Sequence, residues 1–387
     1  MTIDSSPQPL LSTAQRQNYI VALTRVFSYQ NRDGSWGRSL DGRVTYTSQA
    51  IQLMLALGIN HSDPFIIKST RWMEDHIQCG DPHWATRLEI GLKIGDFEKL
   101  VDDHHIDSFF ADLEYDLNHP SEEARLDFFW HVIPTLLALH PYEENYVRRN
   151  GKLIPHEKVI ARAMGYCESF RDDCITVKNQ PNHTGLIALY LSSISDKEGY
   201  SNYKKTSSAM VNWLLESRIE SSEGTNWLHG KGITSYVLMD LLGLPIDSSK
   251  LEAYIPKILK YLTPTTAGKV DGDIVTTFET KLHSESLYAT MLVLRAMTEV
   301  LKRYRNSELN ECLSEARYRY KKKSLFLKLS RFFYYHRTKF PVIISVLLCL
   351  GGGMLFAFGK DMVGSLVVST GFASVIYVFF DWLNKAK

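Results

Sequence analysis

FSYQNRDGSWG, residues Phe27–Gly37, has the composition of a turn between two helices. Asp33-Gly34 suits a tight change of chain direction, and Trp36 supplies a large aromatic side chain that can pack the turn against a neighbour. The segment before it, 15–30, is amphipathic with a helical period, whereas the segment after it, TYTSQAIQLMLAL (45–57), is apolar nearly all round. The pattern predicts an outer helix and an inner helix joined by a short turn.

The same alternation of amphipathic and apolar helices recurs along residues 12–305, which we divide into six pairs. The second helices of the pairs are apolar nearly all round and begin near Tyr46, Trp84, Arg125, Thr184, Thr234 and Leu287. Helices of that kind are buried on both sides, and repeats of about 40–50 residues are typical of stacked helical arrays. The sequence therefore predicts an all-α domain with an inner and an outer ring of helices.

The turn also resembles a known repeat. Gln30–Gly37 is similar to the QxxDGSWG repeat of squalene–hopene cyclases and protein prenyltransferase β subunits. Trp72 and Trp213 fall where that repeat has its outer-helix tryptophan, and Trp227 lies in a weaker copy of the turn. The resemblance covers about residues 12–305 and implies an (α/α)6 toroid with a central cavity.

The catalytic residues of that family are not evident. Its cyclases protonate their substrate with an acid of a DxDD motif, and the nearest match, Val270–Asp273, has only the separated Asp271 and Asp273. These two remain weak catalytic candidates, because a position on a solvated turn explains such acids better. The prenyltransferases hold zinc through a D-x-C motif, whereas Asp173 and Cys174 are adjacent here. We therefore expect no metal and no cofactor, and the sequence favours a non-enzymatic domain without deciding the matter.

A group of polar residues near the expected starts of the inner helices forms a candidate ligand pocket. Its members are Asp127, His183, His229, Lys231, His283 and Glu285. In a toroid these helix ends converge on one mouth of the cavity, and helix N-termini with basic side chains favour an anionic ligand. Capping and turn roles explain each residue singly, so both interpretations stay open.

The C-terminal region contains two uncharged segments of 19 residues, Phe340–Phe358 and Met362–Phe380, separated by Gly359–Asp361. Each is long enough to cross a hydrocarbon core of about 30 Å, and the short link predicts an antiparallel transmembrane hairpin. Small residues that allow close helix packing recur at Ser345, Cys349, Gly353, Ala357, Ser365, Ser369 and Ala373. This spacing fits packing within one hairpin as well as assembly of several hairpins.

Charge is distributed unevenly. Residues 317–387 hold 12 Lys and Arg against 2 Asp and Glu, which leaves 32 against 41 in residues 1–316. The acidic bulk argues against direct nucleic-acid binding, and the basic flank of the hairpin predicts that both termini are cytoplasmic. We expect a flexible N-terminus over 1–11, a cytoplasmic toroid-like domain over 12–305, a basic juxtamembrane helix over 306–339 and the hairpin over 340–387.

Three functions fit this organisation. The first is a sensor and effector of the inner membrane, which resembles the two-transmembrane effectors of bacterial anti-phage systems that act by abortive infection. Its partners would be the lipid bilayer, further copies of the hairpin, and a protein or nucleoprotein regulator. The second is a membrane-bound terpenoid cyclase or prenyltransferase-like enzyme, and the third is an assembly scaffold.

Overall fold

The computed structural model describes residues 8–37, 40–77, 84–94, 103–119, 128–144, 153–169, 175–177, 180–228, 230–246, 248–270 and 287–335. The chain divides into two compact units, Met1–Tyr320 and Lys321–Lys387. The described residues are mostly helical, which confirms the expected all-α class.

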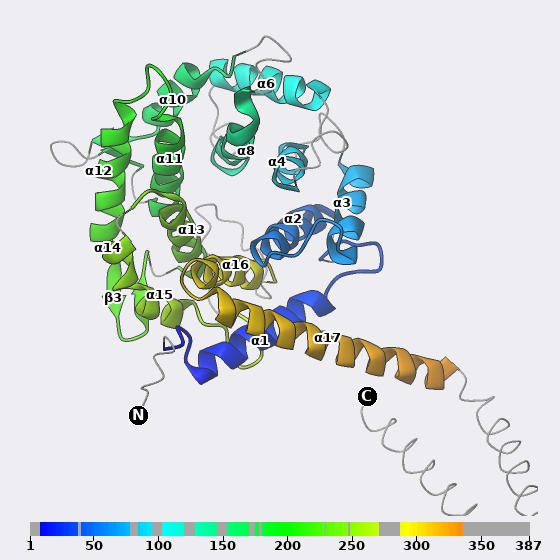
Figure 1. Cartoon of the computed structure of the whole chain (residues 1–387). Coiled ribbons are helices and arrows are strands. Elements are labelled where there is room, and N and C mark those ends of the chain that lie inside the picture. The colour runs from blue at the N-terminus through cyan, green and yellow to red at the C-terminus, as the bar shows by residue number, and fades with distance from the viewer. Residues whose placement is uncertain are drawn as a thin grey trace, which may run out of the picture. The chain divides into compact units, whose positions relative to one another are not determined.

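Six helices form the inner layer of the first unit (Figure 1). They are α2 (Leu40–Ala56), α4 (Trp84–Ile94), α8 (Ile133–Leu139), α11 (Pro181–Ile194), α13 (Lys231–Gly243) and α16 (Leu287–Tyr304). A π-helical turn, η1 (Phe128–Val132), leads into α8. Each inner helix contacts the next one along the chain, and α16 contacts α2, so the six helices close a ring.

The remaining helices of the unit surround this ring in Figure 1. They are α1 (Thr13–Ser28), α3 (Pro64–His76), α6 (Asp103–Asn118), α10 (His156–Gly165), α12 (Tyr203–Glu216), α14 (Ser248–Glu252) and α15 (Ile255–Leu262). A 3-10 turn, η2 (His140–Tyr142), follows α8. Two short antiparallel hairpins pair β1 (Glu168–Ser169) with β2 (Ile175–Thr176), and β3 (Ile219–Ser221) with β4 (Gly224–Asn226). This alternation of outer and inner helices is compatible with an α/α toroid.

The turn between α1 and α2 is held by the residues of its motif. Gly34 has φ +100°, and a Cβ atom there would lie 2.3 Å from the carbonyl oxygen of Lys68 in α3. Trp36 is fully buried, and its indole Nε1 donates to the carbonyl of Val26 at 3.0 Å. The backbone N–H of Trp36 donates to Thr47 Oγ1 of α2, also at 3.0 Å. The turn thus joins the outer helix, the inner helix and the next outer helix.

The weaker copy of this turn has equivalent contacts. Gly224 has φ +135°, and a Cβ atom there would lie 2.3 Å from the carbonyl oxygen of Lys257 in α15. Trp227 is buried, its Nε1 donates to the carbonyl of Leu214 in α12, and its backbone N–H donates to Thr234 Oγ1 of α13. The two turns therefore use one set of contacts to connect successive helices.

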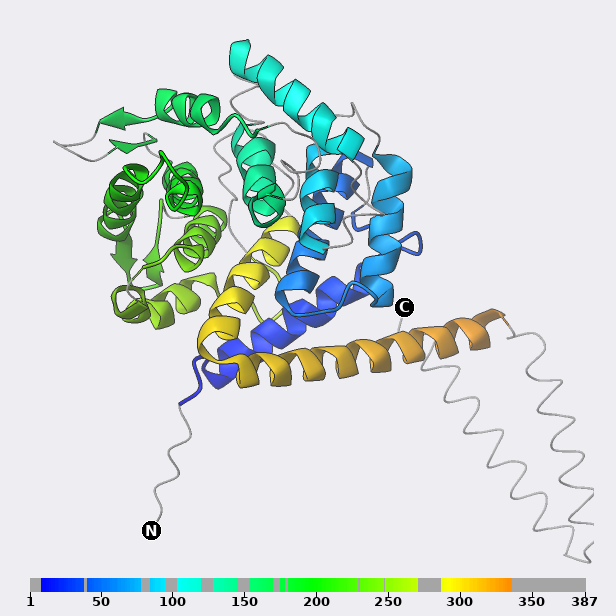
Figure 2. The ribbon, with the colours of Figure 1, turned by 45° about the horizontal axis from the view of Figure 1, so that its top comes forward.

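The long helix α17 (Asn306–Tyr335) follows the ring, and its first part lies beside α1 (Figure 2). The Glu308 carboxylate accepts the backbone N–H groups of Leu10 and Leu11 at 2.9 and 3.2 Å. Arg317 pairs with Asp63 at 2.9 Å. Because of these contacts the first compact unit extends to Tyr320, beyond the boundary at 305 expected from the repeats.

Within the described part of the chain, no helix combines the length and the apolar character needed to cross a membrane. The expected spans, Phe340–Phe358 and Met362–Phe380, lie outside the described residues. So do the small residues Ser345, Cys349, Gly353, Ala357, Ser365, Ser369 and Ala373. The transmembrane hairpin stays a prediction from the sequence.

Candidate functional site

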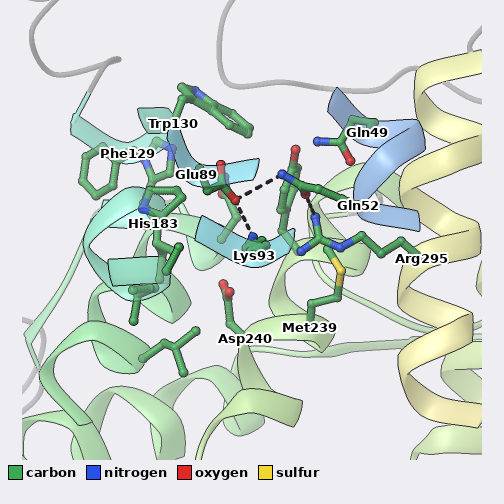
Figure 3. A pocket seen from close by; sticks show the side chains of 17 residues that line it. Gln49, Gln52, Glu89, Lys93, Phe129, Trp130, His183, Met239, Asp240 and Arg295 are labelled. Atoms are coloured by element: carbon green, nitrogen blue, oxygen red, sulfur yellow. Dashed lines mark hydrogen bonds and ion pairs between the residues drawn. The ribbon is translucent and has the colours of Figure 1, made fainter. Parts of the chain in front are cut away.

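A cavity of about 310 Å³ lies at the centre of the helical ring. All six inner helices contribute to its wall, and Figure 3 shows the side chains that line it. Its polar and aromatic lining residues include Gln49 and Gln52 of α2, Glu89 and Lys93 of α4, Trp130 of η1, His183 of α11, Tyr236 and Asp240 of α13, and Arg295 of α16. The volume is at the lower end of the range for small-molecule sites, about 300–1,000 Å³.

A chain of hydrogen bonds crosses the cavity wall from α4 to α16 (Figure 3). The Glu89 carboxylate is buried and accepts from Lys93 and, at 3.1 Å, from Gln52 Nε2. The carbonyl oxygen of the Gln52 side chain in turn accepts from Arg295. Burying a carboxylate is costly unless it is paired and hydrogen-bonded, and here both conditions are met. The chain fixes two cations and one anion at the cavity wall.

Asp240 points into the cavity from α13 (Figure 3) and is 8% exposed. Burial raises the pKa of its carboxyl well above the usual value, and nearby Arg295 opposes that shift only in part. Room for the side chain comes from Gly185 of α11, where a Cβ atom would lie 2.7 Å from Asp240 Oδ2. Burial therefore disfavours the charged form of Asp240, and in its protonated form the carboxyl group can donate a hydrogen bond to a ligand.

Aromatic rings form another part of the wall. The His183 imidazole stacks on Phe129, with centroids 4.0 Å apart and an interplanar angle of 1°. Trp130 meets Tyr236 edge-to-face at 5.2 Å. The Tyr236 hydroxyl is hydrogen-bonded to the hydroxyl of Tyr288, and burial raises the pKa of Tyr236 well above its usual value. Trp130 also contacts the His183 ring edge-to-face at 6.3 Å, so the Trp130 ring lies between His183 and Tyr236.

Two side-chain amides of the wall present carbonyl oxygens without a donor among the described residues. Asn182 of α11 is 6% exposed, and its Oδ1 is buried. The carbonyl oxygen of the Gln49 side chain in α2 is buried too. A buried polar atom without a partner costs about 1–3 kcal/mol, so such atoms mark places where a ligand can bind.

The structure places two of the six pocket candidates. His183 is buried and lines the cavity. Lys231 is not among the lining residues, because its ammonium lies 3.4 Å from the carbonyl oxygen of Thr263 and 5.9 Å from the centre of the Tyr261 ring. These contacts place the Lys231 side chain beside α15.

The other predicted residues cannot be compared with the structure. The pocket candidates Asp127, His229, His283 and Glu285 lie outside the described residues, as do the weak catalytic candidates Asp271 and Asp273. Within the described ranges, no group of three His, Cys, Asp or Glu side chains is arranged to hold a metal ion.

The most informative residues of the cavity were missed from the sequence. They are the isolated polar residues within the apolar inner helices: Gln52 in SQAIQLMLALGI, Glu89 in WATRLEIGLKIGD, Asp240 in TSYVLMDLLGL and Arg295 in SLYATMLVLRAM. The signal was available, since a charged residue in a helix buried on both sides must face a cavity or a partner.

Comparison with known proteins shows a similarity of fold to a solved structure. No protein-family model matches the chain, and no curated protein matches it. A solved structure described as a polysaccharide lyase is similar, with a TM-score of 0.51 and 13% sequence identity over 76% of this chain and 98% of that chain. At this identity the likeness concerns the arrangement of helices alone.

The cavity can perform a limited set of tasks. It brings together a guanidinium, a buried carboxyl group, an ion pair and two buried amide oxygens. Such a set can bind a small polar molecule and fix its orientation. An acid kept neutral by burial can also serve as a proton donor.

Proposed function

We propose that this protein is a membrane-anchored sensor and effector. Its cytoplasmic helical domain, an (α/α)6 toroid, binds a small polar ligand in the central cavity, and its C-terminal hairpin acts on the inner membrane in anti-phage defence by abortive infection. The observation that carries the ligand-binding part is the polar cavity, to which all six inner helices contribute.

The arrangement of the wall supports sensing. Because each inner helix supplies lining residues, a ligand that contacts several of them links its binding to the packing of these helices. A ligand shifts a conformational equilibrium only by its differential affinity for the two states, and a site shared by six helices provides many such contacts. The membrane part rests on the two uncharged segments and their basic flank. The partners proposed are the lipid bilayer, further copies of the hairpin, and a protein or nucleoprotein regulator.

The test is controlled expression of the full-length chain in a bacterium, with and without phage, followed by growth and by a dye that reports membrane potential. We expect growth arrest and depolarisation with the wild type, and neither with the double variant Gly353→Leu and Ser369→Leu. Val346→Leu, in the same predicted span, is the matched control and keeps the effect. Normal growth and potential in infected cells that contain the wild-type protein in their membrane fraction would overturn the proposal.

Asp240 favours a second candidate, the membrane-bound terpenoid cyclase or prenyltransferase-like enzyme. A buried neutral carboxylic acid is the group that protonates an alkene. The buried Glu89 with its polar partners counts against it, because a hydrocarbon substrate needs an apolar wall. The similar structure is described as a lyase of polysaccharides, and a polar wall suits such a substrate better than a hydrocarbon. Conversion of an isoprenoid diphosphate by the purified protein, lost in Asp240→Asn, would establish this candidate.

A further inference from the structure

The charges of the cavity favour an anionic ligand. Glu89 is paired with Lys93, and burial disfavours the charged form of Asp240, so the Arg295 guanidinium is the charged group of the wall that faces no carboxylate partner among the described residues. A guanidinium has five N–H donors, and the bond to Gln52 uses one of them. Its fork matches the oxygens of a carboxylate or phosphate. The anionic part of a ligand therefore belongs beside Arg295.

The amides of the cavity require a ligand with hydrogen-bond donors. Asn182 Oδ1 is buried, and no donor among the described residues reaches it. The same holds for the side-chain oxygen of Gln49 on the other side of the ring. Asp240 complements them, since a neutral carboxyl group donates to a ligand oxygen. Hydroxyl groups both donate and accept, so a polyhydroxylated ligand satisfies all three side chains.

The arrangement of the aromatic rings favours a sugar ring over a nucleobase. A nucleobase is usually recognised by stacking on an open aromatic face. Here one face of Phe129 is covered by His183 in parallel contact, and Trp130 meets Tyr236 edge-to-face. These arrangements provide no parallel slot between two of the rings, whereas the C–H groups of a sugar ring can pack against the Trp130–Tyr236 corner. The volume of about 310 Å³ limits the ligand to one or two sugar rings.

We propose that the central cavity binds an anionic sugar, a mono- or disaccharide that carries one carboxylate or phosphate group. The anion lies against Arg295, and the ring hydroxyls contact Asn182, Gln49 and Asp240. The assignment rests on the proposed ligand-binding function and names the class of its ligand.

The test uses the full-length protein, purified in detergent, and its thermal unfolding followed by tryptophan fluorescence. The probes are D-glucuronate, glucose 6-phosphate, neutral glucose and AMP, each at about 10 mM. We expect glucuronate or glucose 6-phosphate to raise the melting temperature by several degrees, and glucose and AMP to raise it less. The anionic sugar that raises the melting temperature more shows whether the site prefers a carboxylate or a phosphate.

Variants separate recognition from folding. Arg295→Gln keeps a donor for Gln52 but removes the charge, so the Kd for the anionic sugar should rise at least about tenfold. Arg16→Gln, at the surface pair with Glu311, is the matched control. Asn182→Leu should weaken binding by a similar factor while the melting temperature of the free protein stays the same or rises, because a buried side-chain oxygen without a donor is removed.

Equal stabilisation by neutral glucose, stronger stabilisation by AMP, or no stabilisation by either anionic sugar would each overturn the assignment. So would an unchanged Kd in Arg295→Gln. The proposed membrane function is decided separately, because depolarisation of infected cells is measured without knowledge of the ligand. A protein that depolarises cells but binds AMP best would retain the proposed function and lose the anionic-sugar site.

Discussion

Asp240→Asn tests whether the cavity holds a neutral acid. Asparagine has nearly the shape of aspartic acid and keeps a hydrogen-bond donor, but it does not titrate. In the wild type, burial raises the pKa of Asp240 well above its usual value of 3.8. The folded state therefore keeps a proton that the unfolded chain releases as the pH rises above about 4.

The sign of the effect follows from this difference in bound protons. Between the unfolded and the folded pKa, the folded state binds one more proton, so the free energy of unfolding of the wild type falls as the pH rises. The loss is about 1.4 kcal/mol for each pH unit in that interval. Asp240→Asn has no such dependence. Its stability relative to the wild type should therefore increase with pH by about the same amount per unit.

The assay is thermal unfolding of the full-length wild type and variant in steps from pH 5 to 6.5. A change of 1.4 kcal/mol corresponds to a shift in melting temperature of about 2–3 °C in a domain of this size. The melting temperature of the variant minus that of the wild type should thus increase by about 2–3 °C for each pH unit. Asp196→Asn, at an exposed aspartate after α11, is the control for loss of a carboxylate elsewhere.

A difference in melting temperature that stays constant over these pH values would refute the reasoning. It would mean that Asp240 is ionised in the folded protein, for example through a water-filled cavity. The charge argument for an anionic ligand would then fail as well, because Asp240 and Glu89 together would balance Lys93 and Arg295.

Three further predictions concern the ring itself. Gly34→Ala should lower the free energy of unfolding, measured by chemical denaturation, by at least about 2 kcal/mol, because φ is +100° and the new Cβ meets the carbonyl oxygen of Lys68. The control is Gly58→Ala, where φ is +72° but a Cβ atom meets nothing within 4 Å. An equal loss of stability in the two variants would contradict the prediction. Trp227→Ala should cost about 3–5 kcal/mol by loss of a fully buried ring, measured by the same denaturation, and a loss below 1 kcal/mol would contradict the burial. Glu308→Ala should expose residues near Leu10 to proteolysis, since two backbone N–H groups lose their acceptor; an unchanged cleavage pattern would count against it.

The sequence predicted the order of the helices because their periodicity is local. The inner helices α11, α13 and α16 begin at Pro181, Lys231 and Leu287, close to the expected Thr184, Thr234 and Leu287. The turn at Trp36 was predictable too, since its glycine and tryptophan have roles that depend on adjacent residues.

The cavity was predicted less well because its residues come together only when the ring closes. Gln52 and Arg295 are 243 positions apart in the chain, and no local pattern indicates that they meet. The contacts of Lys231 could not be predicted for the same reason. Its position at the start of an inner helix was correct, but the direction of a long side chain depends on what packs beside it, here Tyr261 and Thr263 of the neighbouring repeat.

The contacts between the two ends of the ring determine when the domain can be completed during synthesis. The Tyr19 hydroxyl is hydrogen-bonded to the hydroxyl of Thr298, 279 residues later in the chain. The backbone N–H of Leu10 donates to the Glu308 carboxylate, 298 residues later. At about 5–20 residues per second, the first helix leaves the ribosome roughly 15–60 seconds before its partners exist. The buried face of α1, which includes Leu23 and Phe27, stays uncovered for that time and is a surface for chaperones. The apolar segments at 340–380 are translated within seconds of the last partner, so the ring can close at about the time these segments leave the ribosome.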